Sequence, residues 1–221
     1  MTRVFLLIAF IVALGAGPAG AEPGDANDRG VEYLKQGKFT QAIPELRTAV
    51  EQNPKDTASR MNLAYAYERE GRLDEAIYHY EKVLALKSQE PIARNNLGVL
   101  YDKKGRYDQA IREFQAAMEI DSKSPTAPKN LETAKKNQAA AEERERQIAA
   151  VRKNAEAQPE NPGALYNLAR TYAFYGEKDQ AISWLEKALK LGFKDVAYIK
   201  VDPALDSLRN EPDYVWLLRG R

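Results

Sequence analysis

The chain has 221 residues, no cysteine and a single histidine, His79. Without cysteine it has no disulfide, thiol nucleophile or zinc-binding thiolate, and one histidine cannot complete a nucleophile–base pair by itself. Because 33 basic residues nearly balance 32 acidic ones, the charge gives no case for a nucleic-acid or anionic-membrane partner. We therefore expect a protein that is not an enzyme and that holds no cofactor, no metal and no nucleic acid.

The first 21 residues have the three-part pattern of a secretory signal. Arg3 precedes the apolar run 4–14, and the small residues 19–21 resemble a cleavage site. This apolar run is short for a membrane span, which takes about 20 residues. We expect cleavage after Ala21 and export to the periplasm or out of the cell. The alternative is an uncleaved signal that anchors the chain in a membrane.

Four segments share the pattern Gly-x-x-x-x-Ala-Ile with a bulky residue (Leu, Tyr or Phe) three positions after the isoleucine. Upstream of each stands a small residue and, three positions later, a tyrosine. The pattern predicts two helices joined by a tight turn, in which glycine tolerates a left-handed backbone. The first three copies begin 34 residues apart, and the four starting glycines are Gly37, Gly71, Gly105 and Gly176.

The small residues should let the two helices of each hairpin approach closely. Bulky residues such as Tyr67, Tyr80 and Phe114 cannot be covered within one hairpin, so the hairpins must stack. The small residues expected to face one another are Gly30, Ala64, Gly98 and Ala169 on the first helices, and Ala42, Ala76, Ala110 and Ala181 on the second helices.

This 34-residue period resembles the tetratricopeptide repeat (TPR) family. The resemblance implies an all-α fold, an α-solenoid of TPR helical hairpins, with three repeats in residues 22–124. It also implies that the first helices line a concave, partner-binding surface. Some members clamp acidic C-terminal peptides with basic residues. Here Asn27, Val31, Ile92 and Asn96 occupy that face, so we do not expect a clamp.

Residues 125–161 interrupt the repeats, because the spacing from Gly105 to Gly176 is three residues more than two periods. Ala139 stands where the turn glycine would be, and residues 129–158 contain neither Gly nor Pro. Ala, Glu, Lys, Arg and Gln dominate there, which favours one long charged helix. A degenerate helical pair is the alternative.

Residues 162–221 contain the fourth repeat and a C-terminal helical cap. Gly192 predicts a helix end, and the Asp-Pro and Glu-Pro pairs at 202–203 and 211–212 predict two helix starts. A solenoid must cover its last open face, and we expect the cap to do so with Leu205, Leu208, Trp216, Leu217 and Leu218. Alternatively, Tyr214 and Trp216 form an exposed partner site.

The first helices carry a second stripe, opposite the Leu and Tyr positions, that is not needed to bury the core. The resemblance implies that this stripe faces a groove that binds a protein or peptide partner. Asparagine suits such a groove, because its amide both donates to and accepts from a peptide backbone. The predicted groove residues are Asn62, Tyr65, Arg69, Asn96, Val99, Lys103, Tyr166, Asn167, Arg170 and Phe174.

The sequence thus predicts an exported, non-enzymatic scaffold for protein–protein interaction in the cell envelope. The alternative is a self-associating or membrane-held assembly factor that uses the 129–158 helix instead of the groove.

Overall fold

The computed structural model describes residues 25–219, so the predicted signal at 1–21 lies outside the described residues. Within that range the chain forms α-helices and one 3-10 helix and no strand, which confirms the all-α solenoid fold. The part of the chain described here has no helix with the length and apolarity of a membrane span. The chain divides after Gln138 into two compact units, unit 1 and unit 2.

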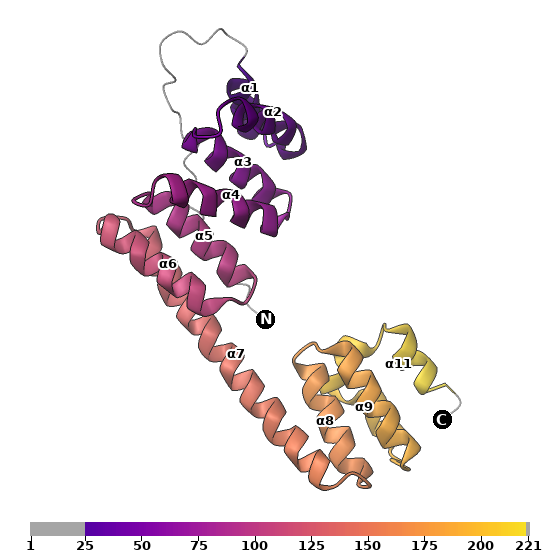
Figure 1. Cartoon of the computed structure of the whole chain (residues 1–221). Coiled ribbons are helices and arrows are strands. Elements are labelled where there is room, and N and C mark those ends of the chain that lie inside the picture. Colours follow the sequence, from indigo (N-terminus) through magenta and orange to yellow (C-terminus); the bar gives the residue numbers. More distant parts are fainter. Residues whose placement is uncertain (1–24, 220–221) are drawn as a thin grey trace. The chain divides into compact units, whose positions relative to one another are not determined.

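Unit 1 consists of three helical hairpins followed by the first part of a long helix (Figure 1). Its core joins the hairpins to one another through apolar residues on both helices of each pair, as stacking requires. The hairpins are α1 (Ala26–Lys35) with α2 (Phe39–Gln52), α3 (Thr57–Arg69) with α4 (Leu73–Leu86), and α5 (Pro91–Lys103) with α6 (Tyr107–Ile120).

Glycine makes the turn within each hairpin, as the sequence predicts. The four turn glycines have φ between 70 and 78°, in the left-handed region that other residues adopt only at a cost. No atom lies within 4 Å of the place where a Cβ would be, so these turns need glycine for its backbone and not for space. They are Gly37, Gly71, Gly105 and Gly176.

Glycines inside the first helices serve close packing instead. A Cβ at Gly98 of α5 would lie 2.6 Å from Cε1 of Phe114, and one at Gly30 would lie 2.5 Å from Cγ of Leu46. The nearest neighbours are thus the bulky residues of the second helices, not the alanines that the sequence suggested. The small residue in each hairpin makes room for one large side chain, which explains why Phe114 and Leu46 are fully buried.

Helix α7 (Thr126–Ala157) is one continuous helix, as the sequence favours over a helical pair. Ala139 takes the position of a turn glycine, and an alanine stabilises the helix where a glycine would have adopted the left-handed turn. Ala134 of α7 is buried in the core of unit 1, and Ile148 and Ala155 are buried in the core of unit 2. Each unit therefore uses a different part of α7 to cover its core.

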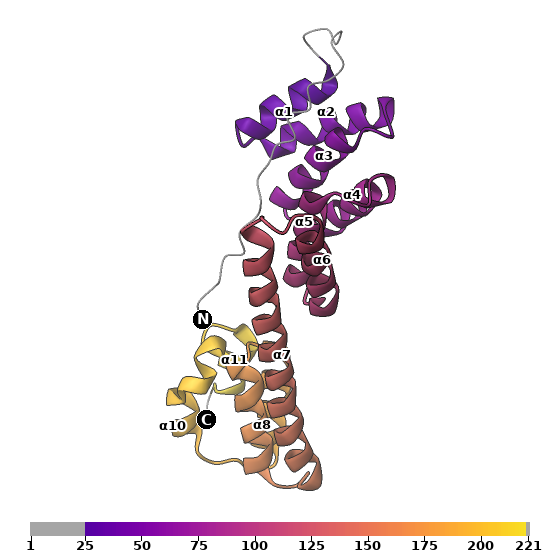
Figure 2. The same ribbon diagram turned by 90° about the vertical axis from the view of Figure 1, so that its left-hand side faces the viewer.

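Unit 2 contains the end of α7, the hairpin of α8 (Pro162–Phe174) and α9 (Lys178–Lys190), and a terminal cap. The cap comprises α10 (Val196–Val201), the 3-10 helix η1 (Pro203–Leu208) and α11 (Pro212–Leu217). Figures 1 and 2 place the cap and α7 on opposite sides of α8. Pro203 and Pro212 begin η1 and α11, and Gly192 (φ 88°) follows α9, as predicted.

One prediction for the cap is wrong. Leu205, Leu208, Leu217 and Leu218 are buried, but Trp216 is 69% exposed and covers nothing. Its place in the core is taken by Tyr214, which is buried and donates a hydrogen bond from its hydroxyl to the Ile199 carbonyl at 3.0 Å. The tyrosine is two residues from the tryptophan on a short helix, so only one of the two can face inward.

Candidate functional site

The predicted groove residues lie on three first helices: α3 and α5 in unit 1, and α8 in unit 2. The prediction that this stripe is not needed for the core is wrong at four positions. Asn62, Asn96, Val99 and Tyr166 are all less than 5% exposed, because neighbouring helices cover them. Asn96 also donates from Nδ2 to the hydroxyl of the buried Tyr80 at 3.2 Å. These four side chains support the packing of the repeats.

Two of the predicted residues on α3 form a compact aromatic and cationic cluster. Tyr65 packs edge-on against Phe39, with ring centroids 6.0 Å apart. The Arg69 guanidinium lies 4.5 Å from the Phe39 centroid and donates to the Tyr65 hydroxyl at 2.7 Å. Arg69 is exposed and Tyr65 partly so, so this cluster is accessible, although its arginine is already held by two aromatic rings.

Lys103, on α5, is paired with a buried carboxylate that sequence reasoning missed. Its Nζ lies 2.7 Å from Glu68 Oε1, and the Glu68 side chain is only 1% exposed. The pair links α3 to α5 across successive repeats. The Lys103 charge is therefore neutralised by the chain itself, which leaves unit 1 without an uncompensated cation at this predicted position.

A second polar link, also missed, joins α5 to α7. Asn130 Nδ2 donates to Asn95 Oδ1 at 3.0 Å, and Asn137 Nδ2 lies 2.9 and 3.2 Å from the two carboxylate oxygens of Asp102. The acceptor and donor stand 35 residues apart in both cases, one more than the repeat period. That spacing is the sequence signal by which these pairs could have been found.

The buried carboxyl group of Asp102 should make the stability of unit 1 depend on pH. Burial raises the pKa of its carboxyl group, and the hydrogen bond from Asn137 offsets this only in part. With a pKa above its unfolded value, the ionised carboxylate opposes folding once the pH exceeds the folded pKa. Asp102→Asn should therefore stabilise unit 1 at pH 7 by on the order of 1 kcal/mol. In urea denaturation, the gain should shrink as the pH falls through the folded pKa; a pH-independent gain would contradict this origin.

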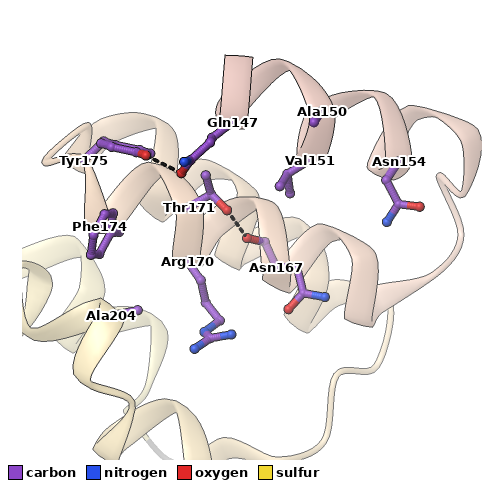
Figure 3. A pocket seen from close by; sticks show the side chains of 10 residues that line it. All are labelled: Gln147, Ala150, Val151, Asn154, Asn167, Arg170, Thr171, Phe174, Tyr175 and Ala204. Atoms are coloured by element: carbon purple, nitrogen blue, oxygen red, sulfur yellow. Dashed lines mark hydrogen bonds between the residues drawn. The ribbon is translucent and has the colours of Figure 1, made fainter. Parts of the chain in front are cut away.

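Unit 2 has a groove of about 540 Å³ between α7, α8 and η1, called here the unit 2 groove (Figure 3). Three predicted residues of α8 line it: Asn167, Arg170 and Phe174. Phe174 is 64% exposed, and the Asn167 side chain is exposed as well. The remaining lining residues are Gln147, Ala150, Val151, Asn154, Thr171, Tyr175 and Ala204.

Arg170 is held in the unit 2 groove by Asp202, which sequence reasoning treated only as a helix start. Its Nε lies 2.5 Å from Asp202 Oδ2, and Asp202 is completely buried. The carboxylate also accepts hydrogen bonds from the Tyr166 hydroxyl at 2.7 Å and from the Ala204 N–H at 3.0 Å. Burial raises the pKa of Asp202, but these hydrogen bonds and Arg170 outweigh it, so the pKa lies below its ordinary value.

The single histidine has a packing role. His79 stacks on Tyr67 with ring centroids 5.5 Å apart and meets Tyr78 edge-on at 5.1 Å. Burial and the charges of Arg60 and Arg47 lower the pKa of His79 to about 4, so the ring is neutral at pH 7. Among residues 25–219, no group of three or more His, Asp or Glu side chains could hold a metal ion.

Profiles of the tetratricopeptide repeat family match residues 27–91, 68–135 and 162–192. The solved first TPR domain of the human RPAP3 protein is 21% identical, covers 53% of this chain and 93% of its own, and superposes with a TM-score of 0.51. The first TPR domain of Spaghetti (RPAP3), bound to an HSP90 peptide, is also 21% identical, covers 52% and 93%, and has a TM-score of 0.50.

No protein with a curated function matches the chain. The three profile matches cover all four repeats that the sequence predicts, and each match spans helices that the structure forms as hairpins. The chain therefore belongs to the tetratricopeptide repeat family, whose members are generally scaffolds for protein interaction.

Proposed function

We propose that this protein is a non-enzymatic scaffold of the cell envelope whose unit 2 groove binds an extended segment of a partner protein. The observation that carries the proposal is the meeting of three predicted groove residues, Asn167, Arg170 and Phe174, along one side of a groove of about 540 Å³. The equivalent stripes in unit 1 are largely buried or paired internally. The unit 2 groove is thus the better candidate.

The chemistry of the groove suits a peptide backbone. Asn154 and Asn167 contribute amides from α7 and α8, and amides can donate to and accept from a backbone whatever its side chains are. Phe174 contributes an exposed aromatic ring at the other end, next to Tyr175 (Figure 3). Such a ring gains most by covering an apolar side chain of a ligand.

Peptide binding by a related fold supports the proposal, since the Spaghetti domain was solved with an HSP90 peptide. The envelope location rests on the signal pattern of residues 1–21. If the signal is cleaved, the scaffold acts as a free exported protein; if it is retained, the scaffold acts at a membrane.

Site-specific photo-crosslinking in cells tests the proposal. Benzoylphenylalanine in place of Phe174 should give a discrete crosslinked product with a partner protein. The same group in place of Tyr78, an exposed aromatic residue on α4 of unit 1, should not. Adding Asn167→Ala should lower the yield at position 174 by roughly fivefold, as expected for losing about 1 kcal/mol of hydrogen bonding.

Two results would contradict the proposal that the unit 2 groove binds a partner segment. Equal products at positions 174 and 78 would show contact without specificity. A product at twice the mass of the chain would instead support self-association, the alternative that the charged α7 suggests.

A further inference from the structure

The charge of the unit 2 groove is set by a residue from outside the regular repeats. Val196, where α10 begins, lies 34 residues after Pro162, where α8 begins, so α10 and η1 stand in register as the first helix of a fifth repeat. Pro203 falls where Ala169 stands in the fourth repeat. Proline lacks an N–H and clashes with the preceding turn, and α10 ends at Val201, two residues before it.

In that register Asp202 occupies a core leucine position. The equivalent residues, Leu63, Leu97 and Leu168, are at most 2% exposed, and Asp202 is just as buried. Burying a carboxylate at a leucine site is unfavourable unless the charge is paired and hydrogen-bonded. Here it is paired with Arg170 and accepts from the Tyr166 hydroxyl and a backbone N–H.

The arginine at position 170 is also a feature of the fourth repeat that the second and third repeats lack. The equivalent positions in the second and third repeats hold Tyr65 and Val99. Arg170 is also the one ionisable cation among the residues that line the unit 2 groove. The chain thus places a cation in the groove and a fully buried anion directly behind it, and the two charges cancel.

We propose that Asp202 is a specificity-determining residue that keeps the unit 2 groove neutral, so that the groove selects an uncharged extended segment with an apolar side chain and rejects acidic segments. The inference rests on the proposed function of the groove. A ligand carboxylate at Arg170 would meet the Asp202 carboxylate beside it, whereas a neutral segment loses no charge hydration on entering. Because Asp202 lies behind Arg170, it acts through the arginine and does not touch the ligand.

The groove also limits the length of the segment. Gln147 and Asn154 are two helical turns apart on α7, about 10 Å at 1.5 Å per residue. An extended chain rises about 3.3 Å per residue, so the groove accommodates about three residues of a partner. Specificity must then come from a short, neutral core such as polar–aromatic–polar.

Selection from a displayed library of short random peptides tests the inference. The bait is the whole protein or one of two variants. Asp202→Asn removes the negative charge behind the groove, and Arg170→Gln removes the positive charge within it. Asparagine keeps one oxygen that can accept from the Ala204 N–H, and its Nδ2 can donate to the Tyr166 hydroxyl, which is able to accept, so this variant removes mainly the charge. The wild type should recover peptides depleted in Asp and Glu. Asp202→Asn should raise the ratio of acidic to neutral peptides about tenfold, and Arg170→Gln should enrich Lys and Arg.

Controls separate failure of the inference from failure of the groove. The double variant Arg170→Gln/Asp202→Asn should restore the neutral preference, and Phe174→Ala should reduce recovery with every bait. If recovery depends on Phe174 but the charge of the peptides is the same for all baits, the groove binds and the role of Asp202 is wrong. If no bait recovers peptides that depend on Phe174, both proposals fail. Should Asp202→Asn not fold, Arg170→Gln alone decides the charge question.

Discussion

Gly98→Ala should destabilise unit 1 by about 2 kcal/mol, although alanine is the better helix former. The added Cβ would lie 2.6 to 2.9 Å from three ring atoms of Phe114, and this ring is fully buried in the core. To relieve this steric overlap, α5 and α6 would have to move apart, which would loosen the contacts along the whole hairpin. Urea denaturation followed by far-UV circular dichroism measures the effect.

A compensating change provides the matched control. The same sixteen-residue separation joins Gly98 to Phe114 and Ala169 to Leu185, both pairs buried. The double variant Gly98→Ala/Phe114→Leu reproduces the pair of the fourth repeat and should recover at least about 1 kcal/mol relative to Gly98→Ala alone. If the costs of the two changes simply add, steric contact with Phe114 is not the cause of the loss.

The repeat architecture could be predicted because its signals are local. A turn glycine with positive φ, a small residue in the first helix and a bulky one in the second recur at fixed spacing, and each reflects one backbone or packing constraint. The continuous α7 follows in the same way from alanine at the turn position and from the lack of Gly and Pro over residues 129–158.

The faces of the first helices could be predicted only in part. Helical periodicity tells which residues of α3 or α5 point the same way, but not whether another helix lies over them. Asn62 and Asn96 are therefore on the predicted face and yet buried. In α8 the corresponding Asn167 is exposed, because the irregular cap does not cover it as a regular repeat would.

Asp202 was missed for a different reason. The Asp-Pro pair predicts a helix start, and Asp202 does accept the Ala204 N–H as a cap. The same residue also stands at the position of the repeat that leucine occupies elsewhere. The sequence therefore gives two different predictions for Asp202, a helix cap and a buried core residue. Only its burial and its contacts to Arg170 and Tyr166 show that both apply.

Asp202→Ala should cost unit 2 about 3 kcal/mol. The substitution leaves the buried Tyr166 hydroxyl without its acceptor, removes the side-chain cap of η1, and frees Arg170 from its ion pair. Both tryptophans of the chain, Trp184 and Trp216, lie in unit 2, so tryptophan fluorescence during urea denaturation follows this unit. Asp202→Asn keeps an acceptor for the cap and places Nδ2 where it can donate to the Tyr166 hydroxyl, so it should cost only about 1 kcal/mol.

The pH dependence separates the charge of Asp202 from its hydrogen bonds. Since its folded pKa lies below the unfolded value, the ionised carboxylate stabilises unit 2 fully above about pH 4, the ordinary pKa of aspartate. That stability is lost as the pH falls through the folded pKa. The advantage of the wild type over Asp202→Asn should therefore hold at pH 7 and disappear in acid. If the advantage is the same at every pH, the charge of Asp202 contributes nothing, and the difference between the two proteins comes from hydrogen bonding alone.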